Sequence, residues 1–420
     1  MRTPSIDVIV FGATSFVGQI LCRYLRDEFG TPDKPGPRPL RWGVAGRSES
    51  KLRGVLKELG IDDAGVPLWV AEADDEAALT KMAGETRVVV STVGPYALYG
   101  NTLVKVCAAQ GTDYCDLSGE AHWVSRMINA HEAAARKSGA RIVSCCGFDS
   151  IPSDLGVWFL QHQAKAKFGE YCSQVKMRVK AMRGAASGGT VASMVNVIRE
   201  ATKDASIRRE YANPYSLCIG ADVAQPSGKD TRQTNLTGPQ FDADYGAWMG
   251  PFVMAAINVR IVFRSHALAG LPYGEGFRYD EGMMMGKGLS GRLRATSFSA
   301  GLGAFVAGAA VAPTRWLMEK TMLPAPGTGP SPAAQERGFW DYRFIGTMPD
   351  GQKIRAKVTG DRDPGYGSTA KMLGEAAACL ALDISKKKRG GGFWTPAIAM
   401  GDALIRRLQD HAGVQFALLD

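Results

Sequence analysis

Two glycines six residues apart follow an apolar run near the start of the chain. Residues 5–11 are mostly apolar and β-branched, which predicts a strand buried in a parallel sheet. Gly12 can make the tight turn after this strand, and Gly18 lets the following helix approach it closely. Because free N–H groups at a helix start attract a pyrophosphate, we expect a dinucleotide on this loop. The loop consists of Gly12, Ala13, Thr14, Ser15, Phe16, Val17 and Gly18.

The side chains after the second predicted strand indicate which dinucleotide is bound. Residues 40–45 run into Gly46, Arg47 and Ser48, and Lys51 follows one helical turn later. An acidic residue at this strand end would bind the ribose 2′-hydroxyl of NAD. An arginine instead offers a permanently charged, two-pronged donor to the 2′-phosphate of NADP. We therefore expect NADP(H), held at its ribose phosphate by Arg47, Ser48 and Lys51.

Two further strand ends extend the expected cofactor site. Residues 66–71 predict a third strand, and Asp74 lies just past its end, where folds of this kind often touch the adenine. Residues 87–92 predict a fourth strand, which opens into Val93, Gly94 and Pro95. Ser15 replaces the middle glycine of the usual G-x-x-G-x-x-G pattern, and its small side chain can itself hydrogen-bond a phosphate.

The elements that must position these residues alternate between strand and helix up to about residue 155. Fifth and sixth strands are expected at residues 112–117 and 140–146. Such alternation makes a doubly wound parallel sheet with right-handed crossovers, a Rossmann-type fold. Every loop named above lies at the carboxyl end of a strand, which is where such folds bind their ligands.

Beyond residue 170 the pattern changes to that of a mixed α+β region. We expect strands at residues 175–181 and 257–263, a helix beginning at Ser187, and a loop over residues 211–250. A hairpin is expected from residues 339–347 and 353–359, and C-terminal helices over 369–382 and 396–410. The predicted domains are therefore a nucleotide-binding domain (1–155), an inserted substrate or oligomerisation domain (156–363) and helices that pack back on the nucleotide domain (364–420).

Composition limits the partners and the compartment. The net charge of +9 favours acidic partners, such as a nucleotide, an anionic membrane surface or an acidic carrier protein. Nucleic acid is disfavoured because the basic residues are spread along the chain without a recognition motif. The eight cysteines include no C-x-x-C pair, and the five histidines are scattered. We therefore expect reduced thiols, no metal site and a cytoplasmic enzyme.

Residues 295–314 form a run of 20 residues without a charge, bounded by Arg294 and Arg315. At about 1.5 Å per residue, a helix of this length could just cross a hydrocarbon core of about 30 Å. Most of the run, however, is Gly, Ala and Ser. Three interpretations stay open: a membrane-spanning helix, a lipid-facing or dimer surface, and a helix buried in the protein.

The order of motifs along the chain resembles the saccharopine dehydrogenase-like oxidoreductases. Within that family, the chain is most similar to the mycobacterial trans-acting enoyl reductases. The resemblance covers nearly the whole chain, and no single motif decides it. It is carried by GATSFVG (12–18), AGR (45–47), VGPY (93–96), YCDLSGE (114–120), CGFDSIPSD (146–154), SGGT (187–190), GYGSTAK (365–371) and GFWTPA (392–397). The resemblance implies NADPH-dependent reduction of an acyl double bond on a polyketide lipid intermediate.

Enoyl reduction needs a hydride on the β-carbon, stabilisation of charge on the thioester oxygen, and a proton for the α-carbon. The candidates lie in loops at the strand ends. Tyr96 or Tyr99 could donate the proton or stabilise the oxyanion, and Asp149 and Ser150 could orient the nicotinamide or the substrate. Turn or helix-capping duty is the alternative for Asp149 and Ser150, and structural hydrogen bonding is the alternative for Asp116 and Glu120.

Two other functions remain open at this point. One is a non-catalytic NADP(H)-binding protein that docks on lipid or on a synthase. The other is a saccharopine-type amine dehydrogenase. For the reductase we expect a long acyl, lipid-like substrate, an acidic acyl carrier protein or polyketide synthase as partner, and a homodimer that contacts a membrane at its periphery through residues 295–314.

Overall fold

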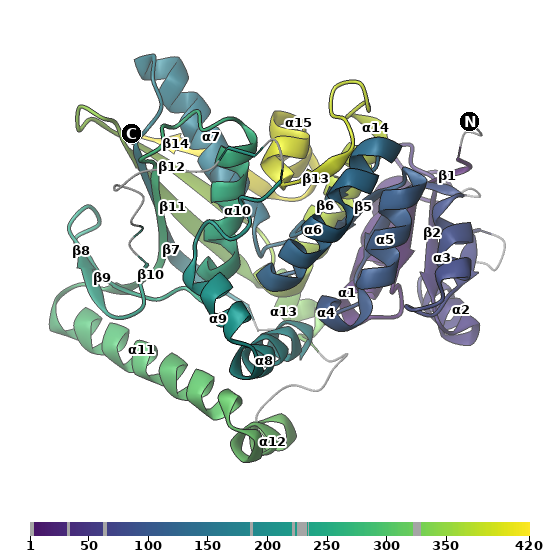
Figure 1. The fold of residues 1–420 in the computed structure, drawn as a ribbon, viewed down its shortest axis with the longest axis horizontal. Coiled ribbons are helices and arrows are strands. Elements are labelled where there is room, and N and C mark those ends of the chain that lie inside the picture. The colour runs from purple at the N-terminus through teal and green to yellow at the C-terminus, as the bar shows by residue number, and fades with distance from the viewer. Residues whose placement is uncertain are drawn as a thin grey trace. The chain divides into compact units, whose positions relative to one another are not determined.

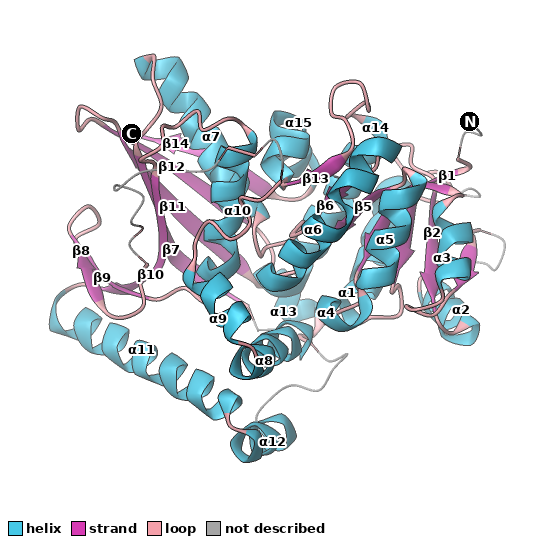
Figure 2. Cartoon of the chain, in the orientation of Figure 1, coloured by secondary structure: helices cyan, strands magenta, loops and turns pink. Residues whose placement is uncertain are grey.

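The computed structural model describes residues 4–31, 34–61, 65–184, 188–220, 223–224, 233, 235–321 and 329–420. The chain forms two compact units. The first comprises Met1–Asp149 and Gly365–Gly413, and the second comprises Ser150–Pro364 and Val414–Asp420. Each unit is built around one seven-stranded sheet with helices packed against it (Figures 1 and 2).

The first unit contains an all-parallel sheet with the strand order β13-β6-β5-β4-β1-β2-β3. Strands β1 to β6 lie in the Rossmann order β3-β2-β1-β4-β5-β6, so the predicted doubly wound sheet is confirmed. The strands are β1 (Ile6–Phe11), β2 (Trp42–Gly46), β3 (Leu68–Val70), β4 (Thr86–Ser91), β5 (Asp113–Asp116), β6 (Arg141–Val143) and β13 (Gly392–Trp394). The chain returns after the second unit to add β13, a strand that the sequence analysis did not expect.

The helices of the first unit connect these strands. They are α1 (Phe16–Phe29), α2 (Glu49–Glu58), α3 (Glu76–Ala83), α4 (Tyr96–Tyr99), α5 (Asn101–Gln110), α6 (Ala121–Ser138), α14 (Thr369–Leu382) and α15 (Pro396–His411). Two of them come from the C-terminal segment, as expected. Helix α14 packs against α1 and against β1, β4 and β5, so the C-terminal segment contributes to the core of the nucleotide-binding sheet.

The second unit contains a mixed sheet with the order β14-β12-β11-β7-β10-β9-β8, in which only the β7–β10 pair is parallel. Its strands are β7 (Gln174–Arg183), β8 (Gln240–Asp242), β9 (Ala247–Gly250), β10 (Arg278–Gly286), β11 (Phe339–Thr347), β12 (Lys353–Gly360) and β14 (Val414–Leu419). The predicted hairpin is confirmed by β11 and β12. The last strand, β14, follows the C-terminal helices and completes this sheet.

The remaining helices belong to the second unit. They are α7 (Ile151–Phe168), α8 (Gly188–Lys203), α9 (Ala205–Ala212), α10 (Ala255–Leu268), α11 (Gly288–Ala310), α12 (Ala312–Thr321) and α13 (Pro332–Glu336), followed by a π-helical turn at Pro364–Ser368. Helix α7 packs on β11 and β12, and α10 packs on α7 and β10. These two helices carry the buried polar groups described below.

Three local expectations for this region need correction. Residues 257–263 lie in the helix α10 and not in a strand. Every residue from 257 to 267 is buried, so the apolar run has no polar face to show helical periodicity. The expected loop over 211–250 contains the short strands β8 and β9. Ser187, the expected start of a helix, lies outside the described residues, and α8 begins at Gly188.

The uncharged run of residues 295–314 lies in α11 and at the start of α12. Most of its residues are exposed, so the interpretation as a buried helix is wrong for the single chain. Among the described residues, no single helix is long and apolar enough to cross a membrane. The bent pair Gly288–Ala310 and Ala312–Met318 meets that test only when its two helices, which are 112° apart, are taken together.

Candidate functional site

The glycine loop between β1 and α1 has the close backbone packing that a dinucleotide loop needs. Gly12 has a φ of +91°, and a Cβ atom there would lie 2.5 Å from Val93 Cγ2. A Cβ atom on Gly18 would lie 2.2 Å from the carbonyl oxygen of Gly12. A side chain at either position would therefore fill the space in which strand, loop and helix meet.

Ser15, the departure from the usual glycine pattern, is the N-cap of α1. Its hydroxyl oxygen accepts a hydrogen bond from the backbone N–H of Gly18 at 2.9 Å and lies 2.9 Å from Thr92 Oγ1. Thr92 Oγ1 also donates to the carbonyl oxygen of Gly12 at 2.9 Å. Thr92 thus ties the end of β4 to the glycine loop. The sequence analysis missed this residue, although its place at the end of a buried strand was visible.

The C-terminal segment of the first unit also reaches this loop. The ring of Phe16 packs edge-on against the ring of Tyr366, with 4.6 Å between their centroids. The backbone N–H of Phe148 donates to Thr369 Oγ1 at 3.2 Å, and Thr369 also borders Gly147. Residues about 350 positions apart in sequence therefore support the loop, which spacing along the chain does not reveal.

The expected cofactor residues lie along the carboxyl edge of the parallel sheet. Thr14, Ser15, Phe16 and Val17 are half-buried, whereas Ala13 is buried. Val93, Gly94 and Pro95 follow β4 beside Gly12. The glycine cradle and the start of α1 at Phe16 fit a dinucleotide pyrophosphate, since a side chain at Gly12 or Gly18 would close the space.

The residues expected at the ribose phosphate lie together at the end of β2. Arg47 is exposed and makes no ion pair with any residue that the structure describes. Ser48 is the N-cap of α2 and accepts a hydrogen bond from the backbone N–H of Lys51 at 3.4 Å. This places an unpaired guanidinium beside a helix N-terminus, which suits a phosphate. Asp74 is exposed in the loop between β3 and α3.

Two carboxyl groups, Asp116 and Asp149, follow the neighbouring strands β5 and β6. Asp116 is fully buried and accepts hydrogen bonds from the backbone N–H groups of Ser118 at 2.9 Å and Cys145 at 3.1 Å. Burial raises the pKa of Asp116 to about 6. Burial, and then repulsion from Asp116, raise the pKa of Asp149 to about 7. Asp149 has no hydrogen-bond partner among the described residues, so its carboxyl is available to a ligand.

Tyr96 is held in a structural arrangement. Its hydroxyl donates to the carbonyl oxygen of Ser91 at 3.0 Å and accepts from the backbone N–H of Leu117 at 3.1 Å. Burial raises the pKa of Tyr96 well above its ordinary value. As a proton donor, Tyr96 would have to give up the bond that ties it to the end of β4. Tyr99, on the same short helix, is 48% exposed.

Glu120 and Ser150 have structural partners in this arrangement. The Glu120 carboxylate accepts hydrogen bonds from the backbone N–H groups of Tyr96 at 2.8 Å and Ala97 at 3.0 Å, and so caps α4. Ser150 precedes α7, but its hydroxyl makes no cap bond. The Ser150 hydroxyl instead lies 3.1 Å from Asn258 Oδ1, to which it donates.

The Ser150–Asn258 contact belongs to a buried polar network in the second unit. The Asn258 amide donates to Glu281 Oε2 at 3.0 Å, and the Tyr279 hydroxyl donates to Glu281 Oε1 at 2.7 Å. Burial raises the pKa of Glu281 to about 7, although hydrogen bonds from Tyr279 and Asn258 favour the charged form. The sequence analysis missed Asn258 and Glu281, because one lay in a supposed strand and the other in an unassigned segment.

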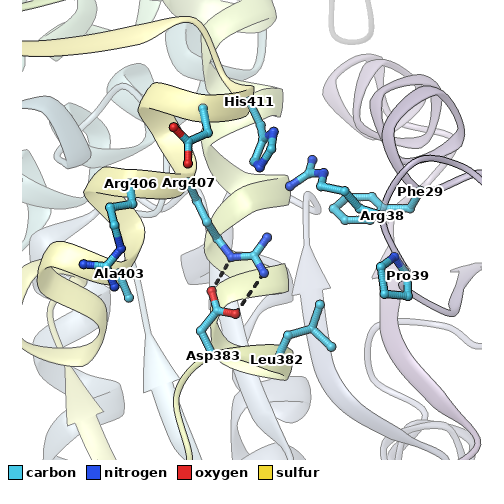
Figure 3. Close-up of a pocket in the computed structure, with 10 residues that line it drawn as sticks. Phe29, Arg38, Pro39, Leu382, Asp383, Ala403, Arg406, Arg407 and His411 are labelled. Atoms are coloured by element: carbon cyan, nitrogen blue, oxygen red, sulfur yellow. Dashed lines mark hydrogen bonds and ion pairs between the residues drawn. The ribbon is translucent and has the colours of Figure 1, made fainter.

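A separate pocket of about 690 Å³ in the first unit is lined by ten residues, among them Arg38 and Arg407, which are already paired (Figure 3). Arg38 contacts Glu375 at 2.6 Å, and Arg407 contacts both Glu375 and Asp383. The Tyr24 hydroxyl also donates to Glu375 at 2.6 Å. Arg38 precedes β2 and Leu382 ends α14, so this pocket does not share the strand ends that carry the glycine loop. We interpret it as a structural ion-pair cluster.

Comparison with known proteins identifies the family. The model of the saccharopine dehydrogenase NADP-binding domain matches residues 8–143. A Mycobacterium tuberculosis protein that carries the provisional name trans-acting enoyl reductase is 38% identical over 411 residues, which cover 97% of this chain and 96% of the relative. The trans-acting enoyl reductase of Mycobacterium leprae is 36% identical over 417 residues, which cover 97% and 96%. The chain belongs to this group of the saccharopine dehydrogenase-like oxidoreductases.

A solved structure agrees with the fold. Saccharopine dehydrogenase (L-Glu forming) from Saccharomyces cerevisiae matches 99% of this chain and 100% of its own length, with a TM-score of 0.52 and 13% identity. Membership of the family, together with the NADP-binding domain, makes this chain an NADP(H)-dependent oxidoreductase. The predictions of the family and of the cofactor are therefore confirmed.

Proposed function

We propose that this protein is an NADPH-dependent enoyl reductase of a long acyl or polyketide thioester. The observation that carries the proposal is the full-length similarity, at 36–38% identity, to relatives named trans-acting enoyl reductases. The arrangement of the first unit supports it, because the glycine loop and a carboxyl group with a raised pKa lie at the same edge of one parallel sheet.

The proposed reaction adds two hydrogens across the carbon–carbon double bond. NADPH, when bound, supplies the hydride that adds to the β-carbon. Electron density then moves onto the thioester oxygen, and the α-carbon takes up a proton as the enolate collapses. We assign this proton to the carboxyl of Asp149. With a pKa of about 7, a large fraction of this carboxyl is protonated at neutral pH.

Asp116 acts as a positioning residue for Asp149. Its carboxyl is fixed by the backbone of Ser118 and Cys145, and it cannot turn towards a ligand without losing those bonds. Its charge favours the protonated form of Asp149. Tyr96 holds the end of β4 in place, whereas Tyr99 is exposed and could contact the substrate.

The substrate would be presented on an acidic acyl carrier protein of a separate polyketide synthase. The word trans-acting in the names of the relatives supports this, as does the net charge of +9. A cytoplasmic location and a homodimer complete the proposal. The mass of the assembly in solution tests the homodimer directly.

The test follows the absorbance of NADPH with the full chain and a matched set of substrates, starting from NADPH for the enoyl and keto forms and from NADP+ for the saturated forms and saccharopine. The set contains long-chain trans-2-enoyl thioesters, free and loaded on an acyl carrier protein, their saturated and keto forms, and saccharopine. Turnover restricted to the enoyl forms is expected. Turnover with saccharopine would favour an amine dehydrogenase. NADPH binding without turnover on any substrate would favour a non-catalytic NADP(H)-binding protein.

A further inference from the structure

Helices α11 and α12 form one bent segment of the second unit (Figure 1). Several large apolar side chains of this segment are exposed. One side of α11 packs on β9, β10 and α8, and it buries Gly291, Ala295 and Ala309. The opposite side exposes Leu289 (71%) and Leu293 (59%). We call the large apolar residues of this segment that are at least 44% exposed the α11–α12 face: Leu289, Leu293, Val306, Val311, Trp316 and Leu317.

The charges on α11 and α12 are mostly positive. The two helices and the residue before them contain Lys287, Arg292, Arg294, Arg315 and Lys320 but only one acidic residue, Glu319. Arg292 and Arg294 stand on either side of Leu293 in the sequence, so they flank the row formed by Leu289 and Leu293 on α11. A surface of this composition attracts an anionic partner.

This charge pattern decides between the possible occupants. A second copy of the chain would bring the same cations against one another, which costs free energy at an interface. The carboxylates of an acidic protein would pair with the cations, but they would not bury the exposed side chains of Leu289, Leu293 and Trp316. An anionic bilayer suits both the cations and the apolar side chains. Its headgroups pair with Lys and Arg, and its acyl boundary accepts the apolar side chains.

The length of the helices also favours contact along the surface. No single helix among the described residues is long and apolar enough to span a bilayer. The 23 residues of α11 extend over about 35 Å and could lie parallel to the membrane. Trp316 is 56% exposed, and Lys320 Nζ lies 4.4 Å from its ring centroid. Tryptophan and lysine side chains are both favoured at the level of the headgroups.

We propose that the α11–α12 face binds the surface of an anionic lipid bilayer as an interfacial, non-spanning anchor. The apolar side chains of Leu289, Leu293, Trp316 and Leu317 enter the acyl boundary, and Arg292 and Arg294 pair with lipid phosphates. This proposal is independent of the reaction that the protein catalyses, and it would hold for any oxidoreductase with this surface.

The test is flotation of the full-length protein with vesicles made of equal parts phosphatidylglycerol and phosphatidylcholine. The wild type is expected to float with these vesicles, and less so with pure phosphatidylcholine or at high salt. The double variant Leu293→Asp, Trp316→Ala is expected to lose roughly ten-fold or more of its partition coefficient. Leu418→Asp is the matched control, since Leu418 is also an exposed leucine of the second unit, on β14. It is expected to float as the wild type does.

A second measurement separates insertion from loose electrostatic attachment. Brominated acyl chains should quench tryptophan fluorescence in the wild type and quench it less in Trp316→Phe, because the other seven tryptophans lie outside the face. Failure of the wild type to float would overturn the proposal. Equal flotation of the Leu293→Asp, Trp316→Ala variant would do the same. Conversion of a wild-type dimer to monomers by that variant, without vesicle binding by the wild type, would instead assign the face to a second copy of the chain.

Discussion

At the scale of single residues, two side chains carry most of the chemistry that we assign. Arg47, at the end of β2, has no ion-pair partner in the described part of the chain, and Asp149 lies at the end of the loop that follows β6. Neither is used by the fold in the way that Tyr96 and Glu120 are. Each can therefore be replaced with limited cost to folding, which makes the two residues suitable for direct tests.

Arg47→Ala is expected to weaken NADPH binding and leave NADH binding nearly unchanged. A charge-assisted hydrogen-bond pair to the 2′-phosphate contributes about 1.5–3 kcal/mol, which corresponds to roughly ten- to one-hundred-fold in affinity. Titration of both cofactors by fluorescence measures the ratio. Arg53→Ala is the matched control, because Arg53 lies on α2, the helix that follows Arg47, and pairs with Glu49 at the surface. An equal loss of affinity for NADPH and NADH would show that Arg47 does not bind the 2′-phosphate.

Asp149→Asn is expected to lower kcat by roughly 10²- to 10⁴-fold, because it removes the proposed proton donor. In the wild type, kcat/KM should fall as the pH rises through about 7, since the carboxyl loses its proton there. The variant should lack this descending limb and should bind NADPH with unchanged affinity. Tyr96→Phe should destabilise the fold yet keep the pH profile. If Tyr96→Phe lost the descending limb of the pH profile and Asp149→Asn kept it, Tyr96 would be identified as the donor.

At the scale of elements, the glycine loop is fixed by close packing between β1, α1 and the end of β4. Gly12→Ala is expected to abolish NADPH binding and destabilise the protein, because Gly12 has φ +91° and an added Cβ would meet Val93 and Thr92. Gly54→Ala is the opposite case. Gly54 lies in the helix α2 with open space around it, so alanine should stabilise by about 0.5–1 kcal/mol. Thermal unfolding and NADPH titration of both variants measure these effects. Equal changes in stability and in NADPH affinity for Gly12→Ala and Gly54→Ala would contradict this account of the loop.

The elements that the sequence predicted correctly are those with strong local signals. A β-branched run followed by Gly12 predicts the strand at residues 5–11. Turn residues at 348–351 between two such runs predict the hairpin. Helix α10 was misread because it is buried all round. The other contacts join distant segments of the chain: Thr92 with Gly12, Tyr366 with Phe16, and Asn258 with Glu281. No spacing rule reveals such contacts, so this part of the candidate site required the structure.

At the scale of the whole molecule, each unit holds a buried carboxyl group that has no cationic partner among the residues that the structure describes. Burial raises the pKa of Asp116 to about 6 and that of Glu281 to about 7. A carboxyl whose pKa is raised in the folded state binds more protons there than in the unfolded chain. Its contribution to stability is therefore complete below the unfolded pKa and is lost as the pH rises through the folded pKa.

We expect the free energy of unfolding to decrease between about pH 4 and pH 7 for this reason. For Glu281, a rise from 4.5 to about 7 amounts to roughly 3 kcal/mol at about 1.4 kcal/mol per pKa unit. Glu281→Gln should reduce that slope without abolishing it, because Asp116 and Asp149 also have raised pKa values. Glu170→Gln, at an exposed position, should keep the full slope. Denaturant unfolding across this pH range is the measurement. An unchanged slope in Glu281→Gln would contradict the assignment.

The most direct test of the enoyl reductase assignment follows the two transferred hydrogens separately. The full chain is incubated with a carrier-bound trans-2-enoyl thioester, once with NADPH deuterated at its transferable position and once in deuterated water. Mass spectrometry should find one deuterium on the β-carbon in the first case and one on the α-carbon in the second. Recovery of unreacted enoyl thioester in both cases, while saccharopine is oxidised with NADP+ or a keto thioester is reduced with NADPH, would contradict the account.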